Sequence, residues 1–152
     1  TSMSNIYSNP IDTAFRLLLV LQNHETDNLT EMRLLSLDFI ATFGRSFQIS
    51  QSSLHGESPL NLAELPARKA LVHKALQYLV THDLVRVFDT KLGFGFVINE
   101  AGKRLVNALE SRYAIEYSAA IQTAEHKYSA MTDEELMVMV QEQWQLQEEV
   151  NR

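Results

Sequence analysis

The sequence predicts a mostly α-helical protein with one small β-hairpin. Apolar residues recur at steps of three and four over residues 66–82, which indicates an amphipathic helix. They alternate at every second position over 85–98, on both sides of a turn at Thr90–Gly93. Helical spacing resumes at 105–109. A helix, a two-stranded hairpin and a helix in this order are typical of a winged helix-turn-helix domain. We expect such a domain over residues 9–112, with C-terminal helices after it.

The first helix is predicted over residues 11–23. Asn9 is a good N-cap residue and Pro10 suits the first helical position, where its missing N–H removes no hydrogen bond. Asp12 and Arg16 lie four residues apart, so they can form an ion pair within the helix. The alternative is that they make a fixed polar contact with a partner.

A second helix is predicted over residues 31–43, with Thr30 as its cap. Asp38 lies among the apolar residues of this helix. It therefore either faces solvent or is a buried carboxylate that needs a hydrogen-bond donor. Residues 45–65 are rich in Ser, Asn and Gln and predict a long surface loop. A loop of this length is usually functional or mobile.

The C-terminal part is predicted as an acidic helical extension over residues 113–152. The helix after the hairpin is expected to continue through 113–130. Thr132 and Glu135 form a capping-box pattern, which predicts a last helix over 133–150. The extension carries 8 acidic and 2 basic side chains, so it accounts for the whole net charge of −6.

Composition excludes several classes of protein. The chain has no cysteine, which excludes disulfides and thiolate metal sites and suits a reducing cytoplasm. Its longest apolar run, residues 17–21, is too short for a membrane span. Thr1 and Ser2 before Met3 are interpreted as a tag remnant within an N-terminal segment, residues 1–8.

The sequence offers little support for catalysis. It contains no glycine-rich phosphate loop, no His-Glu-x-x-His motif and no nucleophile elbow. Asp83, Asp89 and Lys91 are the nearest approach to a nuclease signature, but such residues are common at hairpin turns. We therefore expect a non-enzymatic protein without a metal or cofactor.

DNA-backbone contact is one candidate activity. Residues 66–112 carry 8 basic and 4 acidic side chains, and their spacing places several on the helix face opposite the core and on the hairpin. Such side chains can bind phosphates without reading sequence, although exposed Lys and Arg are usually only solvated. The candidates are Arg68, Lys69, Lys74, Arg86, Lys91 and Lys103.

Protein binding is the other candidate activity. The last helix has more apolar residues than one buried stripe needs, including tryptophan and methionine, which are enriched in interfaces. It can bind a partner, fold back on the core, or pair with a second copy to give a homodimer. The partner-interface candidates are Leu136, Met139, Val140 and Trp144, with Asp12 and Arg16 on the first helix.

Four stretches together resemble one protein family. They are Ile6–Asp12 with Arg16–Leu18, Leu34–Phe39, residues 57–85, and Gly93–Phe96 before Ala101 and Gly102. In order and spacing they are similar to the small middle component of bacterial three-component ABC-type ATPase systems. They are most like the small subunit of Lamassu anti-phage and anti-plasmid defence systems. The resemblance covers residues 5–110 and leaves the acidic extension unassigned.

The resemblance implies a function without catalytic residues. Such a subunit would bind an SMC-like ATPase, bridge it to a nuclease-type effector, and restrain the effector until foreign DNA is sensed. DNA contact would then occur mainly through the complex. The alternative is a dimeric winged-helix transcription regulator, which needs a base-reading helix and a two-fold dimer.

Overall fold

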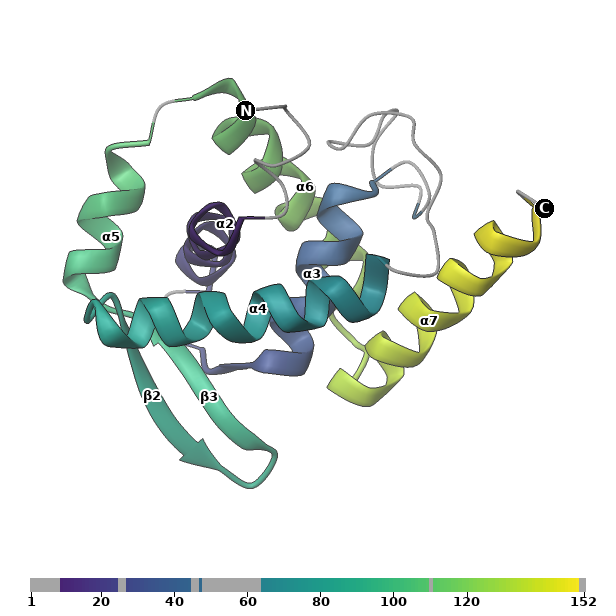
Figure 1. Ribbon diagram of the computed structural model, residues 1–152, viewed down its shortest axis with the longest axis horizontal. Helices are drawn as coiled ribbons and strands as arrows, with labels where there is room; N and C mark the ends of the chain where they lie inside the picture. Colours follow the sequence, from purple (N-terminus) through teal and green to yellow (C-terminus); the bar gives the residue numbers. More distant parts are fainter. Residues whose placement is uncertain (1–8, 25–26, 45–46, 48–63, 110, 151–152) are drawn as a thin grey trace.

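The computed structural model describes residues 9–24, 27–44, 47, 64–109 and 111–150. In Figure 1, helix α2 is seen end-on near the middle of a helical body, and the hairpin of β2 and β3 extends away from that body. The elements in chain order are α2 (Pro10–Gln22), β1 (Leu29–Thr30), α3 (Glu31–Thr42), α4 (Glu64–Thr81), β2 (Val85–Thr90), β3 (Gly93–Ile98), α5 (Glu100–Asn107), α6 (Arg112–Tyr128) and α7 (Asp133–Val150).

The sheet is antiparallel, with strand order β1-β3-β2. Val87 lies opposite Phe96, and Asp89 lies opposite Phe94, so the predicted hairpin and its turn at Thr90–Gly93 are confirmed. The short strand β1 pairs Leu29 with Phe96 and was not predicted. Two residues are too few to show an alternating pattern, so the sequence carried no signal for this strand.

Three of the predicted helix starts, at Asn9, Thr30 and Thr132, are confirmed by their caps, whereas α4 begins earlier than predicted, at Glu64. The Asn9 side chain accepts a hydrogen bond from the Ile11 N–H, and Thr30 accepts one from the Arg33 N–H. Thr132 and Glu135 each accept the other's backbone N–H, which is the reciprocal capping box.

The helix after the hairpin differs from the prediction. It does not continue from residue 105 to residue 130, because α5 ends at Asn107 and a new helix, α6, begins at Arg112. Ser111 caps this new start by accepting a hydrogen bond from the Ala114 N–H.

The core lies where α2 packs against α3, α4, α5 and α6. Its buried side chains include Leu17 on α2, Leu79 on α4, Ile121 on α6 and Leu136 on α7. One apolar cluster therefore contains residues from both sides of the predicted boundary at 112/113. The predicted N-terminal segment 1–8 and nearly all of the predicted loop 45–65 lie outside the described residues.

Asp38 is buried at the point where four helices meet. Its Oδ1 accepts hydrogen bonds from Arg16 Nε at 2.8 Å and from the Tyr117 hydroxyl at 2.7 Å. Its Oδ2 accepts from Arg68 Nη1 at 3.0 Å and from Arg16 Nη2 at 3.3 Å. Each of the four residues lies on a different helix, Arg16 on α2, Asp38 on α3, Arg68 on α4 and Tyr117 on α6. We call them the four-helix polar cluster.

Electrostatics keep this buried carboxylate charged. Burial by itself would raise the pKa of Asp38, but the charges of Arg16 and Arg68, with the hydrogen bonds from Arg16 and Tyr117, hold that pKa well below its usual range. Burial, together with the Asp38 charge, raises the pKa of the Tyr117 hydroxyl well above its usual value, so Tyr117 remains a neutral donor. Of the two alternatives for Asp38, solvent exposure or burial beside a hydrogen-bond donor, the second is therefore correct.

Two predictions for basic residues are wrong because of this cluster. Arg16 does not form an ion pair with Asp12 and cannot contact a partner, because it is 3% exposed and its guanidinium faces Asp38. Arg68 was expected on the exposed face of its helix, but it is 2% exposed. The buried stripe of α4 contains Val72, Ala75 and Leu79, and Arg68 precedes Val72 by one helical turn on that stripe.

His24 has a hydrogen-bond acceptor on each side of its ring. Nδ1 lies 2.9 Å from the Val20 carbonyl oxygen, and Nε2 lies 2.9 Å from Glu125 Oε2. The hydrogen bond to Glu125 raises the pKa of His24, as do the Val20 carbonyl and the charge of Asp27, and together they outweigh the lowering effect of burial. The charged imidazolium satisfies both acceptors and joins the end of α2 to α6.

We expect His24 to make the free energy of unfolding depend on pH. Its folded-state pKa lies above its unfolded value of 6.5, so the stabilisation is present below that value and is lost as the pH rises through the folded pKa. Because the pair is partly exposed, the effect should be below about 1 kcal/mol. Urea unfolding of the wild type and His24→Gln at several pH values measures it. A difference between the two proteins that does not change with pH would contradict the assignment.

Within the part of the chain that the structure describes, every helix is too short or too polar to cross a membrane.

Candidate partner-binding surface

The hairpin carries apolar side chains beyond the core. The cross-strand register places Val85, Val87, Phe94 and Phe96 on one face. At the base of this face, Val85 and Phe96 are buried, whereas towards the tip Val87 is 41% and Phe94 is 63% exposed. Leu92 at the turn is 69% exposed. The outer half of the hairpin therefore presents apolar surface that the body of the protein does not cover.

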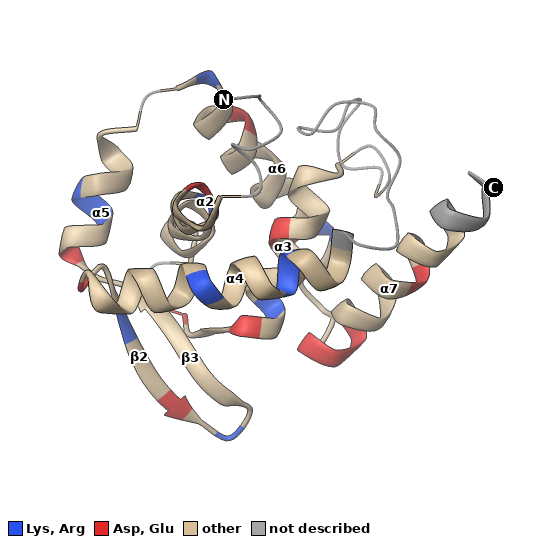
Figure 2. Ribbon diagram, viewed as in Figure 1, with Lys and Arg blue, Asp and Glu red and all other residues tan. Residues whose placement is uncertain are grey.

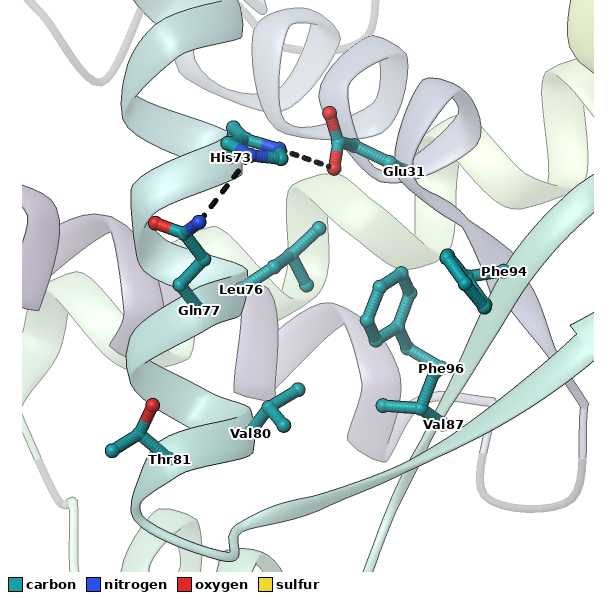
Figure 3. A pocket seen from close by; sticks show the side chains of 9 residues that line it. All are labelled: Glu31, His73, Leu76, Gln77, Val80, Thr81, Val87, Phe94 and Phe96. Carbon is teal, nitrogen blue, oxygen red and sulfur yellow. Dashed lines mark hydrogen bonds and ion pairs between the residues drawn. The ribbon is translucent and has the colours of Figure 1, made fainter.

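A hollow of about 550 Å³ lies between this face and α4. Figure 3 shows Phe94 and Phe96 on the hairpin across from Leu76 and Val80 on the helix. At one end of the hollow, the carboxylate of Glu31 lies 3.1 Å from Nδ1 of His73. The floor is thus apolar, and the polar groups lie at the rim.

A second hollow of about 210 Å³ adjoins the first. It shares Glu31, Phe94 and Phe96 with the first and adds Met32, Asp133 and Glu134 among its lining residues. We call the two adjoining hollows the hairpin groove.

The far wall of the hairpin groove is fixed by polar contacts. Asp133 at the start of α7 accepts a hydrogen bond from the Thr30 hydroxyl at 2.6 Å and pairs with Arg33 at 3.2 Å. Arg33 also donates to the Met131 carbonyl at 2.9 Å. These bonds tie the start of α7 to the start of α3, so this wall of the groove is preformed.

The predicted DNA-contact residues do not gather on one surface. Lys69 and Lys74 are exposed on α4, Arg86 is exposed on the hairpin face opposite Val87, and Lys91 is exposed at the turn. Figure 2 shows Lys and Arg spread over α4, the hairpin and α5, with an acidic residue on the same hairpin. Two further candidates were also expected to be available for DNA. Lys103 instead forms an ion pair with Glu100, and Arg68 is buried.

The predicted partner residues on the last helix largely face the core. Leu136 and Val140 are fully buried where α7 packs against α3. For these two residues, the alternative that the last helix folds back on the core is therefore correct. Met139 and Trp144 are half-buried against the same core. Asp12 on α2 is half-buried as well.

Sequence reasoning missed the hairpin groove as a binding surface. The alternation of Val87, Phe94 and Phe96 predicted the strands, but it was not used to predict which of these side chains stay uncovered. The signal was hairpin length, because alternation that continues to the turn places its outer members away from the helices. In the described part of the chain, no cluster of three or more His, Asp or Glu side chains could hold a metal ion.

A family model matches residues 6–149, nearly the whole chain. The chain belongs to the ABC-three component (ABC-3C) system Middle Component 2 family. No curated protein and no solved structure matches it significantly. The match extends through the acidic extension, beyond the expected limit at residue 110.

Membership in this family makes the chain an accessory middle component of a multi-subunit system, which implies protein partners. It does not distinguish the Lamassu type from other systems. Because no fold match accompanies the family match, the winged-helix assignment stays a prediction.

Proposed function

We propose that this middle component is a non-enzymatic scaffold that joins an SMC-like ATPase to a nuclease-type effector in a Lamassu-like bacterial defence system. The family match over residues 6–149 supports this proposal most directly, because a middle component acts within an assembly. The hairpin groove adds an apolar surface of the kind that marks a protein interface. The scaffold restrains the effector until the ATPase senses foreign DNA.

The restraint can be tested with the purified three-subunit complex. Cleavage of plasmid DNA is measured for the effector alone, for the effector with the ATPase, and for the full complex. The proposal expects cleavage to be lowest in the full complex and to rise when foreign DNA and ATP are added. Equal cleavage with and without the middle component would contradict the restraining role.

Direct DNA contact is a secondary part of the proposal. Replacing Lys69 and Lys74 with Gln removes two exposed positive charges from α4. We expect the complex to bind DNA less tightly whatever its sequence, and with a weaker dependence on salt, because fewer phosphate-bound counterions are released. Arg112→Gln, which removes an exposed charge from α6, is the control. An unchanged affinity and salt slope in the Lys69 and Lys74 variant would argue against contact through α4.

The alternative of a dimeric transcription regulator makes the opposite prediction. A regulator binds one palindromic DNA fragment in preference to others and does so without the ATPase. Binding of the isolated chain to one such fragment, with no affinity for the ATPase, would favour that alternative.

A further inference from the structure

We propose that the hairpin groove binds an amphipathic, positively charged segment of a protein partner. Apolar side chains of that segment pack on Val80, Val87 and Phe94, and its Lys or Arg side chains face Glu31 and Glu134. The inference rests on the proposed scaffold function, because it specifies the chemistry of one segment that the scaffold holds.

Exposed apolar side chains line the groove on both sides. Val80 on α4 is 43% exposed, and across the groove Val87 is 41% and Phe94 is 63% exposed. These side chains face a common hollow from two elements, as Figure 3 shows. An aromatic side chain that a partner covers is a typical source of binding energy, and a preformed site loses little energy to ordering on binding.

The charges around the groove favour a positively charged partner. Three carboxylates line it, from Glu31, Asp133 and Glu134, whereas His73 is the basic side chain among its described lining residues. Arg33 pairs with Asp133, and Glu31 contacts His73. Glu134 is exposed, and no described residue forms an ion pair with it. A partner with positive charge at this end is therefore favoured, and nucleic acid would bring phosphates against carboxylates.

A second copy of the chain fits the groove poorly. A symmetric contact through this face would bring the carboxylate-lined surfaces of two copies together. Insertion of the partner copy's acidic extension would also be repelled, because residues 113–152 carry the whole net charge of −6. The charges thus favour a different chain with a basic apolar segment.

Photo-crosslinking identifies the occupant directly. The full chain, with a photoreactive phenylalanine analogue in place of Phe94, is purified in complex with the ATPase and effector encoded beside it. We expect a crosslinked peptide from one of these subunits that has apolar residues with adjacent Lys or Arg. Crosslinks to an acidic segment, to a second copy or to DNA would overturn the inference, as would no crosslink in an intact complex.

A matched pair of variants tests the face of the hairpin. Val87 and Phe88 are equally exposed, at 41% and 42%, but they lie on opposite faces. Val87→Ser combined with Phe94→Ser should weaken binding of the partner by about thirtyfold, whereas Phe88→Ser should leave it nearly unchanged. Glu134→Lys should weaken binding of the partner more at low salt than at high salt, because salt screens the repulsion between the charges. Equal effects of the variants on the two faces would overturn the inference.

The outcomes separate this inference from the scaffold function. If the complex assembles and the groove variants bind as tightly as the wild type, the groove inference fails and the scaffold function stands. If the wild-type chain binds neither subunit, both fail.

Discussion

Replacing Asp38 with alanine should lower the free energy of unfolding by about 4 kcal/mol, because the change leaves two buried guanidinium groups without their shared carboxylate. Arg16 and Arg68 are 3% and 2% exposed, so water cannot readily replace the lost acceptor. The loss should appear as a lower urea midpoint with little change in slope.

Two further variants test the cause of that loss. Tyr117→Phe removes one hydrogen bond to the carboxylate but no charge, so it should cost about 2 kcal/mol. Asp89→Ala, which removes an exposed carboxylate on the hairpin, should change stability by less than about 0.5 kcal/mol. If Asp38→Ala is no more destabilising than Asp89→Ala, the four-helix polar cluster does not hold the helices together as described.

Gly102→Ala should lower the free energy of unfolding by about 2 kcal/mol. A Cβ at position 102 would lie 2.4 Å from the Leu84 carbonyl oxygen and 2.7 Å from Cγ1 of Ile98. That carbonyl oxygen also accepts the Asn99 N–H at 3.2 Å, so it is not free to move. The free-energy cost of this overlap exceeds the gain of about 1 kcal/mol that replacing glycine with alanine brings to a helix. The result should appear as a lower urea midpoint.

Gly95→Ala is the matched control for the clash. Its Cβ would approach the Cβ of Asn28 at 2.9 Å, but Asn28 is exposed, so it can shift more readily than the hydrogen-bonded Leu84 carbonyl. We expect a loss of less than about 1 kcal/mol. Equal losses at positions 95 and 102 would show that contact with a fixed backbone carbonyl is not the cause.

Local signals in the sequence predicted the elements well. Asn9 with Pro10, and Thr132 with Glu135, gave helix starts because capping depends on residues within one turn. The alternation over 85–98 gave the hairpin for the same reason. The break between α5 and α6 was missed because apolar spacing continued across it, and Ser111 alone was a weak cap signal.

Long-range pairings could not be predicted in the same way. Arg68 has an ordinary position on a helix, and its burial depends on Asp38, which lies 30 residues away in the chain. The last helix shows the same limit, because its apolar residues do not reveal which of them α3 covers. The hairpin groove depends on how far the strands extend past the helices. The length of the alternating stretch indicates this only once the positions of the helices are known.

We expect this middle component to act within an assembly of several proteins. Size-exclusion chromatography with light scattering tests it most directly, on the chain alone and after co-expression with the proteins encoded beside it. The scaffold account predicts a stable complex with a large coiled-coil ATPase. A homodimer that ignores these proteins and binds one specific DNA fragment would contradict it.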